Sequence, residues 1–476
     1  MKVRFKNIGA VKEAEIDLSK KLIVFCGPNN TGKTYLAYCV YLLSKGAFPT
    51  RVPLSSPLPN ILDNDNINIL KQGKGTVNLY DLFIENNDYI KEVIEFTFKT
   101  ELPQAFGLDF ETKEKLFGKA EVEILFDNND IVNKLIWNEK FTANFGLGVE
   151  LLVTFTKKRE SHSLEITLTQ NEPIQEESIK ALLVHLITSN LFQSIISTFI
   201  PNTYIAPVER NSIYTFSKEL SIQRNILVDK MLELNTQKSR NDNPFDMINR
   251  RATRYPLPIR DGLEVAEDLA NYQKRTTEFV EFADCLEKDI LDGKINITKE
   301  GEIQFLPNKA KGLKLPIHIT ASIVKSFSSL IIYFKHLARH GDMIIIDEPE
   351  LNLHPDAQIK VARIIAQIVN KGFKVLINTH SDYIVREMNN LIMLSSITVN
   401  SNGILGELGY ATTDALKPEN VGAYLFDYDH RTKIYVKNLE VSKEGFEAPT
   451  MDNVINDLNE RAQNLYFNIQ DTDNEY

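Results

Sequence analysis

The sequence predicts an α/β fold that carries a phosphate-binding loop, and three observations support this prediction. Residues 22–46 read as a buried strand, a glycine-containing loop and an apolar helix. A second wholly apolar strand, residues 343–346, ends at two carboxylates, and a third, residues 373–377, ends shortly before His380. Strands that are apolar on both faces are typical of parallel sheets, whose ligands bind beyond the carboxyl ends of the strands. The polar residues after the three strands are therefore expected to form one site.

The loop after the first strand fits the pattern G-x-x-x-x-G-K-[ST]. It consists of Gly27, Pro28, Asn29, Asn30, Thr31, Gly32, Lys33 and Thr34. In this pattern the backbone N–H groups of the loop surround phosphate oxygens, and the positive end of the following helix faces the same anion. Lys33 is expected to contact the β- and γ-phosphates of a nucleotide, and the Thr34 hydroxyl to ligate Mg²⁺. Strand, loop and helix together predict a P-loop NTPase.

The residues after the other two apolar strands complete the predicted site. Asp347 is expected to hold Mg²⁺ through water, and Glu348 to orient or deprotonate the attacking water. Alone, this acidic strand end would equally suit a solvated turn, but the P-loop in the same chain favours a catalytic role. A histidine that follows a core strand is usually a packing or capping residue. His380, however, leaves its strand at the same sheet edge, where its ring could hydrogen-bond the γ-phosphate or the attacking water.

The composition restricts the class of protein. The 476 residues suffice for two or three domains, and 43% hydrophobic with 25% charged residues is ordinary for a soluble protein. No run of about eighteen apolar residues exists, so no membrane-spanning helix is expected. Cys26, Cys39 and Cys285 are few and unpatterned, which indicates thiols in a reducing cytoplasm. The net charge of −10 argues against a surface built entirely for nucleic acid, although a local basic patch stays possible.

Hydrophobic periodicity predicts the other elements of the chain. Strands are expected as an antiparallel pair before residue 19, as a second pair within residues 421–439, and at residues 120–126, 150–155, 163–168, 203–207, 295–297, 302–305 and 313–319. Helices are expected at residues 80–84, 179–199, 322–340, 355–371 and 451–465. Thr320 is the expected N-cap and Gly341 the expected C′ residue of the helix at 322–340. Residues 47–75 are predicted to be a loop, and residues 470–476 an acidic, frayed tail.

Residues 212–292 differ in character from the rest of the chain. Charged helical patterns at 213–234 and 263–291 flank a loop that contains Arg240, Arg250, Arg251, Arg254 and Arg260. Two long helices around one loop suggest an antiparallel hairpin that projects from the body. An ordinary helical subdomain packed on the body fits the pattern equally well. The arginines read as a solvated loop or as a contact for a partner or for phosphates.

The order of the motifs resembles the ABC-type ATPase heads of the SMC, RecF and OLD (overcoming lysogenisation defect) class. The resemblance rests on the loop at 27–34, Asp347-Glu348-Pro349-Glu350, Leu351-Asn352-Leu353-His354-Pro355 and Thr379-His380-Ser381. It covers roughly residues 1–45 and 313–395, and it is strongest to the stand-alone ATPases of bacterial antiphage defence systems, such as Septu-type and retron-linked cassettes.

This resemblance implies ATP and Mg²⁺ as cofactors. It makes Asp347 the Walker B acid, Glu348 the catalytic glutamate, His380 the switch histidine and residues 351–354 the D-loop. The predicted architecture is an α/β P-loop NTPase with an ABC-type ATPase head, an inserted helical arm and a small C-terminal α/β element. Residues 1–211 and 293–400 would form the head, residues 212–292 the arm, and residues 401–476 the C-terminal element.

The sequence departs from the resemblance at the signature motif. ABC heads use a serine- and glycine-rich segment to contact the γ-phosphate bound by the partner subunit, whereas residues 320–326 contain no glycine. Ser322 and the first N–H groups of its helix could still receive that phosphate, and Lys325 could add charge. A plain helix start is the alternative. No Q-loop glutamine is evident, and Arg210 follows a core strand where relatives often carry a basic residue.

The resemblance favours a cytoplasmic ATPase that regulates an antiphage system. Two heads would engage around ATP in a homodimer or higher homo-oligomer and control an effector protein, a nuclease or toxin. Nucleic acid is a further candidate partner, and no membrane partner is expected. The alternative is a DNA-repair or chromosome-handling ATPase of RecF or SMC type that binds DNA directly. A transporter ATPase subunit is disfavoured by the missing glycine-rich signature and by the large insertion.

A nuclease in the same chain was a further possibility, because OLD relatives can carry a metal-dependent TOPRIM nuclease domain. Asp427 and Asp429 resemble the end of such a site. Little of the chain remains for that domain after His380, so a hairpin turn is the favoured interpretation of this acidic pair.

Overall fold

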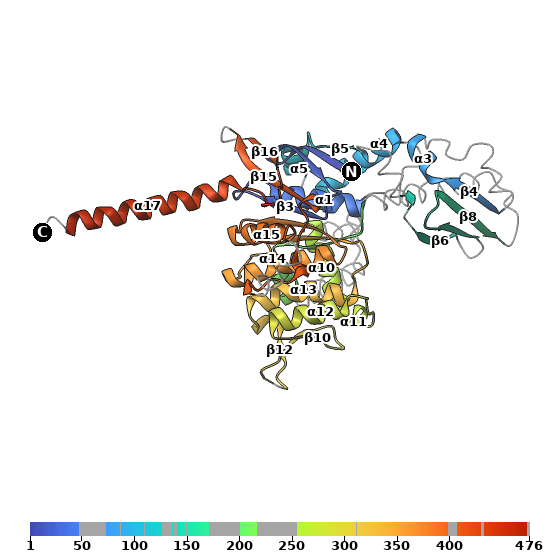
Figure 1. The fold of residues 1–476 in the computed structure, drawn as a ribbon. Coiled ribbons are helices and arrows are strands. Elements are labelled where there is room, and N and C mark those ends of the chain that lie inside the picture. The colour runs from blue at the N-terminus through green and yellow to red at the C-terminus, as the bar shows by residue number, and fades with distance from the viewer. Residues whose placement is uncertain are drawn as a thin grey trace, which may run out of the picture. The chain divides into compact units, whose positions relative to one another are not determined.

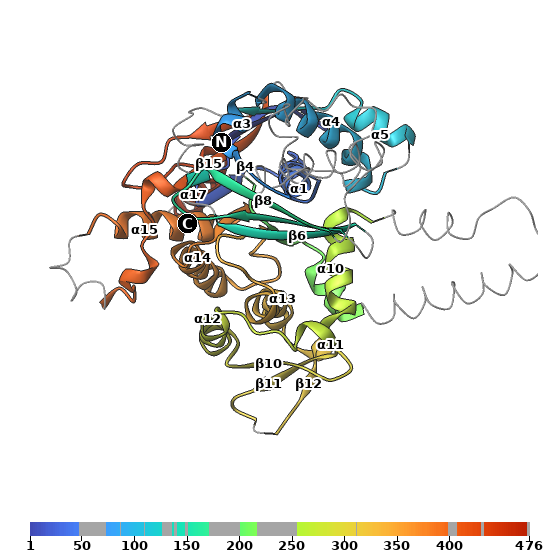
Figure 2. The ribbon, with the colours of Figure 1, turned by 90° about the vertical axis from the view of Figure 1, so that its right-hand side faces the viewer.

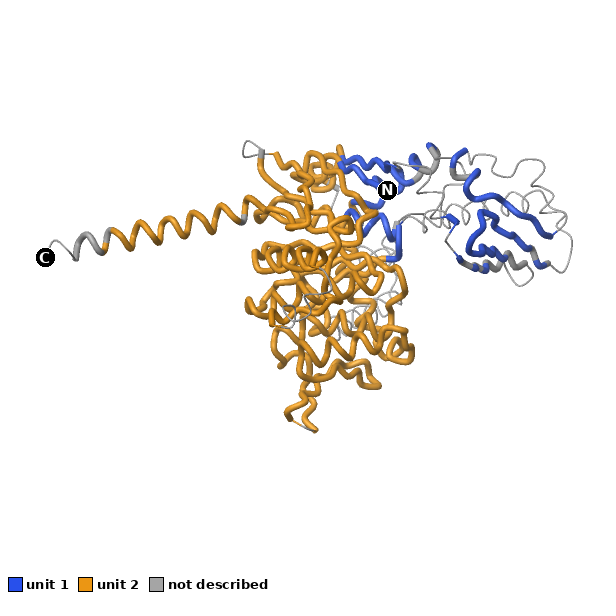
Figure 3. Tube along the Cα trace, viewed as in Figure 1, with its two compact units in different colours: residues 1–5, 39–102, 120–202 blue, residues 6–38, 103–119, 203–476 orange. Residues whose placement is uncertain are grey.

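A computed structural model describes residues 1–46, 73–85, 87–108, 110–125, 136–137, 140–147, 151–170, 200–216, 255–310, 312–397, 407–429 and 433–473. The chain divides into two compact units (Figure 3). Unit 1 comprises Met1–Phe5, Cys39–Leu102 and Ala120–Asn202, and unit 2 comprises Lys6–Tyr38, Pro103–Lys119 and Thr203–Tyr476. Among the described residues, no helix is long and apolar enough to cross a membrane.

Unit 2 is built on a mixed sheet whose strands are ordered β2-β16-β15-β3-β14-β13-β9. These strands are β2 (Val11–Asp17), β16 (Lys433–Leu439), β15 (Val421–Asp429), β3 (Leu22–Cys26), β14 (Lys374–Thr379), β13 (Met343–Asp347) and β9 (Thr203–Ala206). β15, β3, β14, β13 and β9 run parallel to one another. β3 and β13 are buried along their whole length, as their apolar sequences predicted.

The register of the parallel strands brings their carboxyl ends to one edge of the sheet. Cys26 pairs with Thr379, and Asp347 pairs with Asn378. The chain therefore leaves β3, β13 and β14 at the same place, which confirms the arrangement predicted from the three apolar runs.

Helices cover this sheet and bury a large apolar core. They are α1 (Lys33–Gly46), α5 (Phe110–Phe117), α10 (Leu257–Glu267), α11 (Leu269–Tyr272), α12 (Val280–Leu286), α13 (Ser322–His336), α14 (Pro355–Asn370) and α15 (Asp382–Leu394). Helix α17 (Pro449–Asp473) is not one of them, because most of its residues are exposed. Figure 1 shows α14, α13 and α12 one below another, and Figure 2 shows the end of α13 beside both of the other helices. A small sheet of β10 (Gly293–Ile297), β11 (Ile303–Pro307) and β12 (Leu315–Pro316) follows α12.

The prediction of one long helix at 263–291 is wrong. The segment is divided into α10, α11, α12 and a π-helical turn (Glu287–Leu291). The Thr277 hydroxyl accepts a hydrogen bond from the Phe279 N–H and bonds to the Phe334 carbonyl, so a side chain takes the place of the helical hydrogen bonds there. Phe282 and Leu286 are buried against α13, which favours a helical subdomain packed on the body over a projecting hairpin for the described part of the insertion.

Three further details of unit 2 differ from the prediction. Helix α13 ends at His336 rather than near residue 340, and its N-cap is Ala321, because the Thr320 hydroxyl bonds to the Ile317 carbonyl of the preceding 3₁₀ turn. Gly341 lies in a left-handed turn after the helix and is not its C′ residue. The strand predicted at 313–319 is reduced to β12, since the 3₁₀ turn Ile317–Ile319 follows Pro316.

The C-terminal element agrees with the predicted pair of strands and helix. β15 and β16 pair antiparallel, and Asp429 lies opposite Lys433 at the end of the hairpin. The helix is longer than predicted, because α17 continues to Asp473 and includes the start of the segment expected to fray.

Unit 1 contains an antiparallel sheet ordered β4-β8-β7-β6. Its strands are β4 (Lys74–Asn78), β6 (Phe141–Leu147), β7 (Leu151–Lys157) and β8 (Ser163–Gln170). β5 (Glu121–Leu125) lies beside β1 (Lys2–Ile8), where Arg4 donates to Glu123 over 2.9 Å. The predicted strands at 120–126, 150–155 and 163–168 and the helix at 80–84, now α3 (Leu79–Glu85), are confirmed, whereas α4 (Asn87–Ala105), α5, β4 and β6 were missed.

Several predictions fall on residues outside the described ones. These are the helix at 179–199, most of the helix at 213–234, residues 47–72 of the predicted loop, and Arg240, Arg250, Arg251 and Arg254.

Candidate nucleotide-binding site

The loop after β3 adopts a conformation that depends on its glycines and on Asn30. Gly27 has φ +133°, and a Cβ added there would lie 2.2 Å from the carbonyl oxygen of Phe426 in the neighbouring strand β15. Gly32 has φ +81° and Asn30 has φ +62°, so both lie in the left-handed region that these residue types tolerate best. The loop therefore approaches β15 more closely than any side chain at position 27 would allow.

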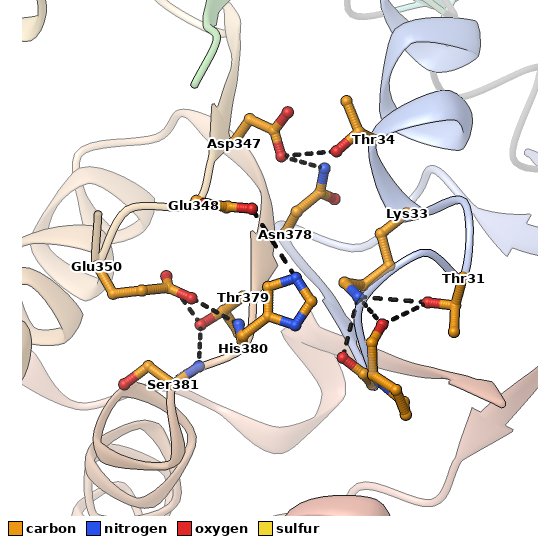
Figure 4. Close-up of polar contacts among 12 residues, drawn as sticks. Thr31, Lys33, Thr34, Asp347, Glu348, Glu350, Asn378, Thr379, His380 and Ser381 are labelled. Carbon is orange, nitrogen blue, oxygen red and sulfur yellow. Dashed lines mark hydrogen bonds and ion pairs between the residues drawn. The ribbon is translucent and has the colours of Figure 1, made fainter. Parts of the chain in front are cut away.

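Lys33 is folded onto its own loop (Figure 4). Its Nζ donates to the carbonyl oxygens of Gly27 and Pro28 over 2.9 and 2.6 Å and lies 3.3 Å from Thr31 Oγ1. Only 4% of the residue is exposed. Burial lowers the pKa of Lys33 to about 8, although Asp347 and Glu348 act in the opposite direction. To contact a phosphate, the lysine would have to leave these carbonyl oxygens.

The residues predicted to hold Mg²⁺ lie together. Thr34 Oγ1 is 3.3 Å from Asp347 Oδ1, and the Asn378 amide donates to the same carboxylate oxygen over 2.7 Å. Asp347 Oδ2 and Asn378 Oδ1 are buried without a hydrogen-bond partner among the described residues. Burial raises the pKa of Asp347 to about 6. Buried oxygen atoms in need of a partner are the ligands that a hard cation prefers, so this group fits Mg²⁺, bound directly or through water.

Glu348 and His380 face each other beside the P-loop. Their Oε1 and Nε2 atoms are 3.9 Å apart, and both residues line a cavity of about 600 Å³ (Figure 4). Ala10, residues 29–35 and Leu116 form the rest of its lining. Burial, followed by the charge of Lys33, lowers the pKa of His380 to about 4. His380 is therefore neutral at pH 7, and its contact with Glu348 is not an ion pair.

A buried carboxylate holds the backbone at His380. Glu350 accepts hydrogen bonds from the His380 N–H over 2.5 Å and from the Thr379 hydroxyl over 3.0 Å. Burial raises the pKa of Glu350. The next residue, Ser381, caps α15 through its hydroxyl, which accepts from the Ile384 N–H. The ends of β13 and β14 are thus connected by the side chain of Glu350.

Arg210 holds the backbone on the other side of the same turn. Its guanidinium donates to the carbonyl oxygens of Asp347 and Glu348 over 2.7 and 2.8 Å and to that of Pro207 over 3.0 Å. Only 2% of the residue is exposed, and burial lowers its pKa. Glu348 has φ +49°, a strained conformation for glutamate, and its N–H donates to the Asn378 carbonyl. Arg210 and Asn378 therefore stabilise the conformation that directs Glu348 into the cavity.

The structure brings most of the predicted site residues together. Lys33, Thr34, Asp347, Glu348 and His380 meet at the carboxyl edge of the sheet. Ser322 and Lys325 lie in the first turns of α13 and do not belong to the cavity lining.

Sequence reasoning missed three residues of the site and left the role of Arg210 open. Asn378, at the end of the third apolar strand, could have been inferred from its position. Glu350 was named within the motif at 347–350 but was given no role, and Tyr428 gave no signal of this kind. The Tyr428 hydroxyl lies 3.3 Å from the carbonyl oxygen of Asn29, and the two residues are 399 positions apart in the sequence.

Comparisons with known proteins agree with this geometry. The model of the AAA ATPase domain family matches residues 1–385. No curated protein matches the sequence.

Similar solved structures include an Smc head bound to the C-winged helix domain of ScpA, with 12% identity, a TM-score of 0.35 and coverage of 93% of this chain and 98% of that chain. An Smc head with an extended coiled coil bound to the C-terminal domain of ScpA, derived from Pyrococcus furiosus, has 14% identity, a TM-score of 0.32 and coverage of 97% and 98%. The SMC head domain from Thermotoga maritima has 10% identity, a TM-score of 0.30 and coverage of 92% and 98%.

The lowered pKa of Lys33 predicts proton uptake when ATP binds. At pH 9 the lysine of the free protein is mostly neutral, because its pKa is about 8. Contact with phosphate favours the charged form and raises this pKa, so binding should take up close to one proton per site. At pH 6.5 the lysine is already charged and should take up none. Calorimetry of ATP binding in two buffers with different ionisation enthalpies measures the uptake.

ATP affinity should accordingly fall as the pH rises through 8. Cys26 cannot account for the effect, because burial raises its pKa to about 12. Equal heats in the two buffers at pH 9 would contradict the prediction.

The contacts of Arg210 predict a defect in turnover rather than in binding. In Arg210→Lys a single ammonium replaces a fork that bonds two carbonyls, so Glu348 loses its fixed position. We expect kcat for ATP hydrolysis to fall about 10- to 100-fold, since small displacements of catalytic groups have effects of this size. KM should change little, because Lys33 and its loop belong to other elements. Arg275→Lys, at an exposed arginine, is the matched control. A parallel loss of ATP binding in Arg210→Lys would refute a positioning role.

Proposed function

Because this chain belongs to the AAA ATPase domain family, it is an ATPase, and we propose that ATP-dependent engagement of two such heads controls a partner effector in bacterial antiphage defence. The observation that carries the proposed hydrolytic chemistry is the convergence of Lys33, Thr34, Asp347, Glu348 and His380 at one sheet edge. The antiphage setting is supported by the resemblance of the motif set to stand-alone defence ATPases.

Binding of ATP would use the loop at 27–34 and the first turn of α1. The backbone N–H groups and the helix N-terminus face the phosphates, and Lys33 turns from its carbonyl partners toward the β- and γ-phosphates. The cavity of about 600 Å³ beside the loop is large enough for a nucleotide. Thr34, Asp347 and Asn378 would hold Mg²⁺, which supplies charge neutralisation at the phosphates when bound.

Hydrolysis would depend on Glu348 and His380. The Glu348 carboxylate accepts a hydrogen bond, and then a proton, from the attacking water. His380 is neutral, so its ring can donate an N–H to the γ-phosphate or the water without adding a charge to the site. Glu350 and Arg210 keep both residues in place through backbone contacts.

The second half of each site would come from another copy of the chain. Ser322 and the first N–H groups of α13 form a helix N-terminus that can receive the γ-phosphate bound by the partner head, and Lys325 adds a positive charge nearby. ATP would then join the two heads, and hydrolysis would release them. Such a cycle converts nucleotide binding into motion, which must act on another molecule.

That molecule is proposed to be an effector protein. Among the described residues no cluster of three or more His, Cys, Asp or Glu could hold a metal ion, and Asp427 and Asp429 lie at the end of a hairpin strand. The part of the chain that the structure describes thus offers one catalytic centre, at the P-loop. The inserted segment 212–292 and the C-terminal element 401–476 are the proposed docking surfaces for the effector.

Glu348→Gln should bind ATP but hydrolyse it about 10²–10⁴-fold more slowly, because the amide cannot accept a proton. The variant should also accumulate an ATP-dependent head-engaged species in light scattering, and addition of Ser322→Arg should prevent this species from forming. Lys33→Ala serves as the control that does not bind ATP. Glu447→Gln, which changes an exposed glutamate in the same way, serves as the matched control. Unchanged turnover in Glu348→Gln would assign the catalytic role to another residue.

The purified chain should hydrolyse ATP and leave DNA and RNA intact in Mg²⁺ or Mn²⁺, since the damaging activity is assigned to the effector. Mass spectrometry of proteins that copurify with the chain should identify the effector. Cleavage of nucleic acid by the pure protein that Asp427→Ala with Asp429→Ala abolishes would place a nuclease in this chain instead. Tight, salt-dependent binding of duplex DNA would favour the DNA-repair alternative.

A further inference from the structure

Helix α17 exposes large apolar side chains along most of its length. It spans 25 residues, Pro449–Asp473, which corresponds to about 37 Å. Leu458, Leu465 and Ile469 are 58%, 67% and 59% exposed. A solvent-exposed helix of a monomeric protein usually carries polar side chains in such positions. We therefore expect another protein surface to cover the apolar side chains of α17.

The spacing of these side chains identifies the kind of occupant. Ile455, Leu458, Ala462, Leu465 and Ile469 follow one another at alternating intervals of three and four residues. This 3,4 alternation is the a/d pattern of a coiled coil, which keeps one narrow seam facing a partner helix. Ile455, Ala462 and Ile469 take the a positions, and Leu458 and Leu465 take the d positions.

We propose that α17 pairs with α17 of a second copy of this chain in a parallel, two-stranded coiled coil. Isoleucine at two of the three a positions, together with leucine at both d positions, favours two parallel strands over three or four. The flanking positions are compatible with this arrangement. In a parallel pair the g residue of one helix faces the following e residue of the other, so Val454 faces Asn459 and Arg461 faces Tyr466. Neither pair brings like charges together, and Arg461 can stack on the tyrosine ring.

The pairing is independent of ATP, because α17 contributes no residue to the nucleotide site. It therefore goes beyond the ATP-dependent engagement of heads. A permanent connection through α17 would keep two heads at a high effective concentration even after hydrolysis separates them. The first turn of α17 is attached to the body, since Asp452 lies 3.5 Å from Arg386 of α15.

The test compares two substitutions on the same helix. Leu465 and Phe467 are similarly exposed, at 67% and 59%. A rotation of about 200° around the helix axis separates them, so they lie on nearly opposite sides of the helix. The double variant Leu458→Asp, Leu465→Asp should be monomeric in nucleotide-free analytical ultracentrifugation at micromolar concentration. The wild type and Phe467→Asp should remain dimeric or form larger assemblies built from dimers. Unchanged ATP binding and thermal unfolding show that the double variant is folded.

The parallel orientation is tested by cross-linking in full-length protein with Cys285→Ser, which removes the exposed native thiol. Leu458→Cys and Leu465→Cys should each form disulfide-linked homodimers, because the same d position of the two helices meets in register in a parallel pair. A nucleotide-free wild type that is monomeric overturns the proposal. An equal loss of dimer in Phe467→Asp, or disulfides that form only in mixtures of the two cysteine variants, overturns it as well.

Discussion

At the end of β13 the chain turns through Glu348 in a left-handed conformation, and the guanidinium of Arg210 donates to the carbonyls on both sides of that turn. The positions of Asp347 and Glu348 depend on this contact. If the turn relaxed, the Glu348 carboxylate would leave the cavity, and the Asp347 carboxylate would shift relative to Thr34. An arginine suits this role because its planar fork reaches two acceptors at once and stays charged when buried. The conformational strain at Glu348 is offset by hydrogen bonds that a buried charge makes stronger.

The charges of the site are incompletely balanced within the protein alone. Burial lowers the pKa of Lys33 to about 8 and raises that of Asp347 to about 6, so both groups are displaced toward their neutral forms. A phosphate beside the lysine and a cation beside the carboxylate reverse both displacements. The pKa of Lys33 is lowered from 10.5 to about 8, which corresponds to roughly 3 kcal/mol. Contact with phosphate can recover this free energy. The site is thus organised for a ligand that carries an anion and a divalent cation together.

The sequence allowed the fold class and the centre of the site to be predicted, because their signals are local. Gly27–Thr34 form a continuous motif, and apolar runs end directly at Asp347 and near His380. Residues that act through the backbone leave no such pattern, which is why Glu350 was missed and the role of Arg210 stayed open. The broken helix at 263–291 has a similar cause, since the hydroxyl of Thr277 replaces helical hydrogen bonds in a stretch whose periodicity continues. In α4, Pro103 lies inside the helix and weakens the pattern that would have revealed it.

The attachment of α17 has a mechanical consequence for the nucleotide site. Helix α15 begins at Asp382, two residues after His380, and its Asn389 makes two hydrogen bonds of 2.9 and 3.0 Å with the backbone of Phe446, just before α17. A rotation of α15 would therefore be transmitted to the base of α17. Over a helix of about 37 Å, a tilt of about 5° displaces the far end by about 3 Å. The two hydrogen bonds of Asn389 thus make the direction of α17 depend on the position of α15.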